Sequence, residues 1–145
     1  MYDIQTPLLD PNIIPTVSVA SMNQTHREEI DLINRLGTQL AEGMRGTLDA
    51  EGISNTLNDW VEHTRRHFEG ENQLMQQYGF PAWDMHEKEH ERVLALLEEH
   101  QRQWLEKRRV EALADFVFEV WPSWFNHHLN TMDWVTAHFI TGQGG

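Results

Sequence analysis

The chain has 145 residues, no cysteine and a formal net charge of −12, with 23 acidic side chains against 11 basic ones. This length suits one domain with its own core, and the lack of cysteine excludes disulfides, thiolate clusters and cysteine nucleophiles. The negative charge argues against nucleic acid or an anionic membrane surface as a partner. No run approaches the roughly 20 apolar residues of a membrane span, and the first residues lack a signal pattern. We therefore expect a soluble cytoplasmic protein that neither binds nucleic acid nor inserts into a membrane.

The N-terminal stretch changes character near residue 20. Pro7, Pro11 and Pro15 prevent a continuous helix, so residues 1–19 should form an extended arm. From about Met22, apolar residues recur at three- and four-residue steps, as they do on one face of a helix. Two glycines after residue 42 should end this first helix.

A second and a third helix follow. The second should begin near Ser54, a plausible N-cap, and stop at the Tyr-Gly-Phe-Pro turn of residues 78–81. The third should open near Asp84, whose carboxylate can cap it, and run to the basic residues 107–109. Positive charge in a last turn suits the helix dipole.

A fourth helix is expected from about Glu111 to Ile140. Pro122 lies inside it and should interrupt or kink it. No strand alternation and no internal repeat are visible. The sequence therefore predicts a single all-α domain over 1–145, built as a four-helix up-down-up-down bundle over about 20–140, with a frayed tail at 141–145.

Seven potential metal ligands lie on the apolar faces of these helices. Residues four apart share a helix face, so a His and its partner one turn later can reach the same point. Imidazole and carboxylate suit iron, manganese, zinc or copper, and seven such groups are too many for one ion. The pattern therefore predicts two metal ions and the ligands His26, His67, Glu71, His86, His90, His128 and Asp133.

The number of ligands indicates what the two metals could do. Two octahedral ions offer twelve positions. Five imidazoles, two bridging carboxylates and one bridging oxide or hydroxide leave a single position open for a small molecule. Neutral imidazoles also favour reduced metals, so this set suits reversible binding better than oxygen activation and indicates iron.

These motifs resemble those of the hemerythrin family, in particular the stand-alone bacterial type. The resemblance covers about residues 20–140 and is carried by HREEIDLINRL, HFEGENQLMQQYGFP, HEKEHERV and WFNHHLNTMD. The family order is present in full: a lone His, then HxxxE, HxxxH and HxxxxD. The chain departs from the family in lacking an acidic residue shortly before the first His. Thr136 also stands where an aromatic residue is common.

The resemblance implies a site and a function. One iron would be held by His86, His90 and His128, and the other by His26 and His67. Glu71 and Asp133 would bridge the two irons. Dioxygen would bind reversibly at the open position of the second iron, for storage, delivery or sensing. The alternatives are a di-iron enzyme acting on peroxide or nitric oxide, or an iron-storage or iron-binding protein.

The choice of His128 over its neighbour rests on spacing. His128 precedes Asp133 by five residues, as in the family, and shares a stripe with Trp121 and Trp124, whereas His127 turns about 100° away. A spacing of five is about 140° around a straight helix, which is awkward for two ligands of one centre. We therefore predict a local π-type turn between residues 128 and 133.

Five further residues are expected to surround the centre. His63 lies one turn before His67, and it either donates a hydrogen bond to the ligands or merely fills space. The others are first of all core residues, some of which should also exclude water from the site. The expected pocket residues are His63, Trp124, Trp121, Met22 and Phe68.

Two rival motifs overlap the third helix. HEKEH at residues 86–90 matches the HExxH pattern of zinc proteases with Glu87 as the base, but the chain is too short for that fold. Glu87 and His90 also form one ExxH motif, whereas ferritin-like oxidases need two and two further Glu. Both readings are disfavoured.

Overall fold

The computed structural model describes residues 16–144, and four long helices make up almost all of this range. The first three are α1 (Ala20–Met44), α2 (Ala50–Tyr78) and α3 (Trp83–Lys107). The fourth is continuous but changes its winding, and its successive segments are α4 (Val110–Asp115), η1 (Phe116–Val120), α5 (Trp121–His128), η2 (Leu129–Asp133) and α6 (Trp134–Gly142). The two η segments are π-helical.

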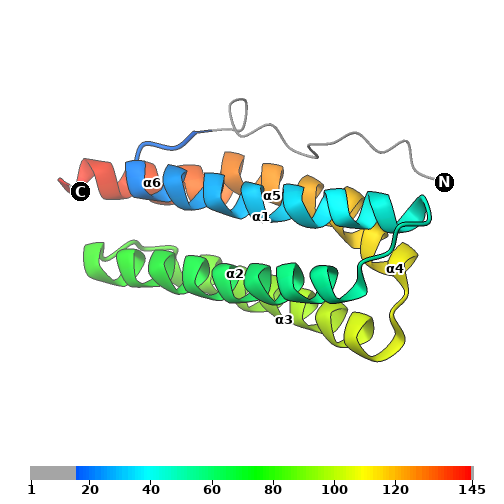
Figure 1. Cartoon of the computed structure of the whole chain (residues 1–145). Coiled ribbons are helices and arrows are strands. Elements are labelled where there is room, and N and C mark those ends of the chain that lie inside the picture. The colour runs from blue at the N-terminus through cyan, green and yellow to red at the C-terminus, as the bar shows by residue number, and fades with distance from the viewer. Residues whose placement is uncertain (1–15, 145) are drawn as a thin grey trace.

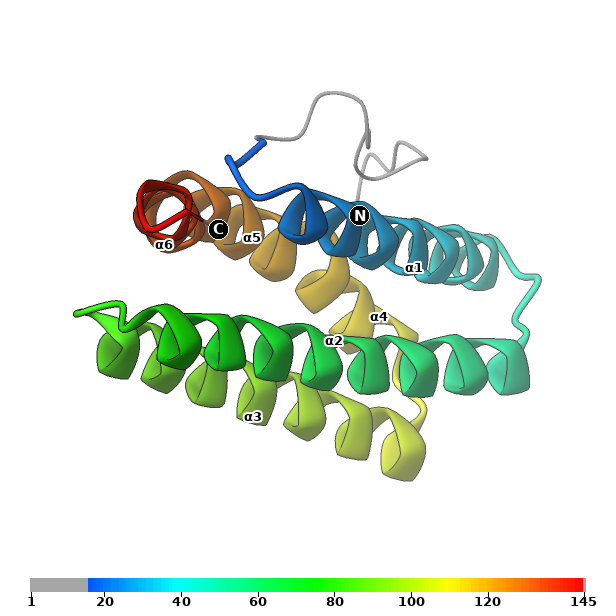
Figure 2. The ribbon, with the colours of Figure 1, turned by 90° about the vertical axis from the view of Figure 1, so that its left-hand side faces the viewer.

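The helices run alternately up and down in two layers, α1 with the fourth helix and α2 with α3 (Figures 1 and 2). The connections are short, at residues 45–49, 79–82 and 108–109, so successive helices must pack antiparallel. The start of α1 and the end of α6 therefore lie at the same end of the bundle (Figure 1). The predicted all-α four-helix bundle is confirmed. Over residues 16–144, no helix is both long and apolar enough to cross a bilayer.

One predicted helix start and two predicted helix caps are wrong, whereas α3 begins within one residue of the predicted place. α2 begins four residues before Ser54, because Asp49 caps it by accepting a hydrogen bond from the Gly52 N–H at 2.9 Å. Ser54 lies buried within the helix, where its hydroxyl donates to the Ala50 carbonyl. Asp84 lies inside the first turn of α3 and pairs with Lys88 instead of capping the helix.

Left-handed residues end the two middle helices. Gly79 closes α2 with φ of 66°, a conformation that glycine adopts without a steric penalty. Arg108 closes α3 with φ of 52°, although it carries a side chain. Its guanidinium donates to the Ser54 hydroxyl and lies 5.3 Å from the ring centre of Trp104. These contacts hold the chain where it turns from α3 into α4.

The fourth helix passes Pro122 without breaking, contrary to the expected interruption. Proline has no N–H to donate, and the helix widens just before it, in η1. There the Trp121 N–H donates to the Phe116 carbonyl, five residues back. The second π segment, η2, covers Leu129–Asp133, so the π-type turn predicted from the ligand spacing is confirmed.

The apolar core fills the end of the bundle near the α1–α2 and α3–α4 connections. Its fully buried members are contributed by all four helices, among them Leu36, Leu40, Ile53, Leu57, Leu97, Trp104 and Leu113. Of the expected N-terminal arm, residues 1–15 lie outside the described range. α6 continues to Gly142, two residues into the expected tail. Polar groups gather toward the opposite end, and a smaller apolar cluster that includes Val17, Met22 and Ala137 lies beyond them.

Candidate metal centre

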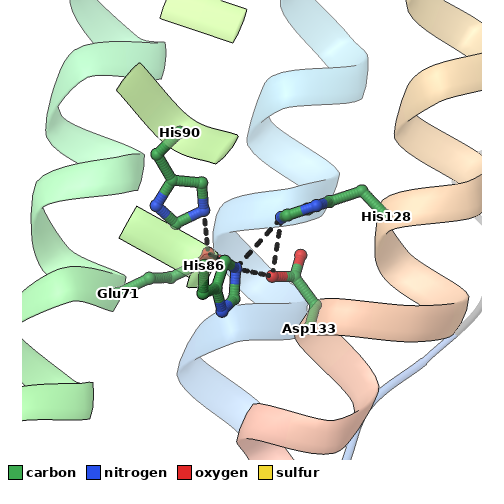
Figure 3. A group of neighbouring side chains, drawn as sticks. All are labelled: Glu71, His86, His90, His128 and Asp133. Carbon is green, nitrogen blue, oxygen red and sulfur yellow. Dashed lines mark hydrogen bonds and ion pairs between the residues drawn. The ribbon is translucent and has the colours of Figure 1, made fainter. Parts of the chain in front are cut away.

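All seven predicted ligands meet at one buried place between the four helices. His26 comes from α1, His67 and Glu71 from α2, and the two His of the HxxxH motif from α3. The fourth helix supplies the remaining pair, His128 at the end of α5 and Asp133 at the end of η2. All seven are buried: His26, His67, Glu71, His86, His90, His128 and Asp133. Figure 3 shows five of them pointing toward one another.

Three imidazoles form the first group around the two carboxylates (Figure 3). His86 Nε2 and His128 Nε2 lie 3.0 and 3.1 Å from Asp133 Oδ1 and 3.1 Å from each other. His90 Nε2 lies 3.1 Å from Glu71 Oε1. One nitrogen of each ring thus faces a shared point.

The other two imidazoles form a second group around the opposite oxygens of the same carboxylates. His26 Nε2 lies 3.0 Å from Asp133 Oδ2 and 3.3 Å from Glu71 Oε2. His67 Nε2 lies 2.9 Å from Glu71 Oε2. Each carboxylate therefore directs one oxygen to each group, which is the arrangement of a ligand that bridges two ions.

The donor geometry fits metal ions. Two ligands about 2.1 Å from one ion and at right angles lie about 3.0 Å apart, close to the separations found in both groups. Several facing atoms, including His26 Nε2, His90 Nε2 and both Asp133 oxygens, make no hydrogen bond within residues 16–144. Burying such groups without partners is costly. A pair of cations would satisfy them together.

The two carboxylates stay charged despite their burial. Burial favours the protonated form, but His67 and His26 near Glu71, and His128 near Asp133, lower both carboxyl pKa values. Burial lowers the pKa of His90 to about 4, so this ring is neutral at pH 7, as a metal ligand must be. Burial also opposes the charged form of His67, yet Glu71 and Glu29 outweigh it and raise its pKa well above the usual value. A cation binding here must displace that proton.

Hydrogen bonds behind the ligands orient two of the rings. His86 Nδ1 donates to the Thr136 hydroxyl and His90 Nδ1 to the Asn72 side-chain oxygen, each at 2.8 Å. These bonds fix the rings with Nε2 facing the centre. The sequence identified Thr136 only as a replacement for an aromatic residue and overlooked Asn72, which directly follows Glu71.

Glu29 is a buried acidic residue beside the centre that the sequence analysis also overlooked. This fully buried carboxylate of α1 accepts hydrogen bonds from Trp60 Nε1 at 3.0 Å and the Thr64 hydroxyl at 2.6 Å. It also lies 2.5 Å from His63 Nδ1. Burial alone would raise the pKa of Glu29, but His63 and His67 lower it to about 2. Its position three residues after His26, on the same helix face, was the available signal.

Four of the five expected pocket residues adjoin the ligands. The Phe68 ring stacks on His90 with centroids 4.1 Å apart, and the Trp124 ring stacks on His128 at 4.5 Å. Met22 and His63 line a cavity that reaches the centre. Trp121 lies further away: it packs on Trp124 and Trp60, and within residues 16–144 no ring contact joins it to a ligand.

The rejected candidates stay apart from the centre. His127 is exposed, as expected from its turn away from the stripe. Glu87 belongs to neither ligand group within residues 16–144. His100 lies far from the ligands and is half-buried, with its ring stacked on Phe116 at 4.0 Å.

Comparison with known proteins gives one consistent answer. Residues 17–137 match the family described as Hemerythrin HHE cation binding domain. A protein named Bacteriohemerythrin from Aquifex aeolicus (strain VF5) is 28% identical over 130 residues, which cover 90% of this chain and 95% of the relative. Another of that name, from Ralstonia nicotianae, is 31% identical over 96 residues, covering 66% and 68%. A third, from Stenotrophomonas maltophilia, is 22% identical over 121 residues, covering 83% and 74%.

Proposed function

This chain belongs to the hemerythrin family, and on that premise we propose that it is a non-haem di-iron protein that binds dioxygen reversibly. It would serve in oxygen storage, delivery or sensing. The cytoplasmic location expected from the sequence is part of the same proposal.

One observation carries the proposal: two carboxylates divide their oxygens between two groups of imidazoles. Glu71 directs Oε1 to His90 and Oε2 to His26 and His67, and Asp133 divides its oxygens in the same way. We assign His86, His90 and His128 to one iron and His26 and His67 to the other, with Glu71 and Asp133 as bridges. Together with a bridging oxide or hydroxide, this set leaves one coordination position open.

The side chains around the ligands suit reversible binding. When bound, ferrous ions would supply the electrons and the open coordination position that dioxygen requires. Phe68 and Trp124 cover the three-imidazole group, and Phe125 lies edge-on to His26 with ring centroids 5.8 Å apart. Of these rings, Phe125 excludes water from one side of the two-imidazole group, where the open position would lie, and this shielding would slow the escape of charged oxygen species.

A cavity of about 390 Å³ supports an alternative function as an enzyme. It reaches His67 and Glu71, which belong to the two-imidazole group, and it exceeds what dioxygen alone requires. Peroxide or nitric oxide could reach the same ion by this path. The alternative function is therefore a di-iron enzyme acting on peroxide or nitric oxide; no comparable observation favours iron storage.

Anaerobic reconstitution with ferrous iron, followed by admission of air, tests the proposal. We expect about two irons per chain and a visible charge-transfer band that disappears when oxygen is removed. Fast, irreversible oxidation with turnover of added peroxide would support the enzyme instead. Binding of a single ion per chain would contradict both.

A pair of variants tests the ligand assignment. His67→Ala should lose one iron and all dioxygen binding, because His26 would be the single imidazole left on the second ion beside the two bridging carboxylates. His127→Ala, an exposed neighbour of a ligand, should keep both. Iron content and the oxygen-dependent spectrum measure the difference, and equal behaviour of the two variants would overturn the assignment.

A further inference from the structure

A cavity between α1 and α2 connects solvent with the centre. Its volume is about 390 Å³, and Glu28, His63, His67 and Glu71 are among its lining residues. The exposed fraction of the side chain falls from 53% at Glu28 to 14% at His63, and it is only 2% at His67 and 4% at Glu71. The cavity is therefore a passage from the surface to the two-imidazole group.

Metal-binding side chains follow one another along this passage at short distances. Glu28 Oε2 lies 3.7 Å from His63 Nε2, and His63 Nδ1 lies 2.5 Å from Glu29 Oε2. Glu29 Oε2 is 3.8 Å from His67 Nδ1, and the far nitrogen of that ring is 2.9 Å from Glu71. Between Glu28 and Glu71, donor atoms of successive side chains thus lie no more than 3.8 Å apart.

Beside the middle of the passage, three side chains have the composition of a weak metal site: His63 and His67 line the cavity, and the fully buried Glu29 lies behind them. One donor atom from each of Glu29, His63 and His67 lies within 4.8 Å of the others. His67 Nδ1 is buried and has no hydrogen-bond partner within residues 16–144. Two imidazoles and a carboxylate suit divalent first-row metals such as ferrous iron. With only three donors, and with the other Glu29 oxygen engaged by Trp60 and Thr64, such a site would release its ion readily.

We propose that this passage is the path by which ferrous iron reaches the centre, and that Glu29, His63 and His67 hold the ion in transit. The inference rests on the di-iron function proposed above. Conduction along a path requires sites strong enough to accept an ion and weak enough to pass it on. The exposed Glu28 collects the cation, and the buried ligands of the centre retain it.

Arg66 provides a discriminating observation, because it also lines the passage. Its guanidinium takes part in no ion pair among the residues described, whereas its neighbour Arg65 pairs with Glu62 and Glu98. A positive charge at this place repels ferrous iron and attracts anions. If the cavity admits ferrous iron, removal of the Arg66 charge should speed entry. If the cavity admits an anion instead, the same change should slow its entry.

Uptake kinetics test the path. Apoprotein is mixed anaerobically with ferrous iron, and a coloured chelator added at intervals captures the iron not yet bound. Glu28→Gln should slow uptake by about tenfold, the lower range of electrostatic steering effects, and His63→Gln should slow it because a donor nitrogen is lost. Arg66→Gln should accelerate it, and His127→Gln, exposed and remote from the passage, should match the wild type. All four variants should reach the final iron content of the wild type.

A steric variant tests the same path without changing charge. Gly70 lines the cavity, and a Cβ added there would meet nothing within 4 Å. Gly70→Leu should therefore fold and slow uptake by narrowing the passage, whereas Gly70→Ala should have little effect.

Two sets of results would overturn the path. One is wild-type uptake rates in Glu28→Gln, His63→Gln and Gly70→Leu; the other is slower uptake in Arg66→Gln. A wild-type chain that fails to bind two irons at any time would overturn the di-iron function, and the uptake path with it. Circular dichroism of each apoprotein separates slow uptake from a failure to fold.

Discussion

The two ends of the bundle are built from the same four helices, yet they contain opposite chemistry. Near the α1–α2 connection the buried stripe of each helix consists of apolar side chains, such as Leu40, Ile53 and Leu57. Toward the other end the same stripe carries imidazoles and carboxylates, with only a small apolar cluster of Val17, Met22 and Ala137 beyond them. Trp60 lies between the apolar and the polar region, with its ring against Trp121 and its N–H donating to Glu29.

The difference lies in what stabilises each end. Apolar side chains are stabilised by leaving water, whatever else is bound. Buried imidazoles and carboxylates lose their hydrogen bonds to water, and this loss is compensated only by well-placed hydrogen-bond partners or bound ions. The apolar end therefore supplies the rigidity that holds seven donors in place, and the polar end depends on its ligand.

The largest effect should follow from Glu71→Gln, which removes a bridge from both groups. We expect loss of both irons and of the stabilisation that they provide, which is about 4 kcal/mol when free metal exceeds its dissociation constant 1,000-fold. Thermal unfolding with and without ferrous iron measures this effect. Glu69→Gln, an exposed control on the same helix, should keep the iron-dependent rise in melting temperature.

Leu97→Ala should affect the opposite end. This fully buried side chain belongs to the apolar core, so truncation should cost about 2–5 kcal/mol of unfolding free energy. The iron content should stay at the wild-type value. Leu105→Ala, at an exposed position of the same helix, should change stability little. If Leu97→Ala lowered iron content while leaving the fold intact, the two ends would not be separable.

Thr136→Val should have a smaller, local effect. It removes the hydroxyl that accepts from His86 Nδ1 and leaves the size of the side chain almost unchanged. We expect metal affinity to fall by about 10- to 100-fold, measured by competition with a chelator. Thr131→Val, in which the lost hydroxyl bonded to the His127 carbonyl at the surface, is the matched control.

The smallest effect concerns pH at the apolar end. Burial against Phe116 lowers the pKa of His100, so the folded chain disfavours its charged form. As pH falls below the ordinary imidazole pKa of about 6.5, the unfolded chain binds the proton first, and stability is lost. In His100→Gln, the melting temperature of the iron-loaded protein should fall less between pH 7.5 and pH 5.5. An equal fall in both proteins would show that His100 does not contribute.

The sequence by itself determined the four helices, their order and the seven donors, because burial on one face repeats at helical spacing. It also determined the π-turn, since a five-residue step between His128 and Asp133 cannot serve one centre on a regular helix. Asp49 was overlooked as the cap of α2, although the side-chain type was suitable.

Tertiary structure alone decided which groups stand behind the donors. Glu29, Asn72 and Thr136 are ordinary helix residues by spacing, and they contact the centre only because α2 or α3 places a partner opposite each one. The passage along His63 likewise exists only where α1 and α2 pack. A helical period fixes which face a residue occupies, but the neighbour across that face depends on how separate helices are set against one another.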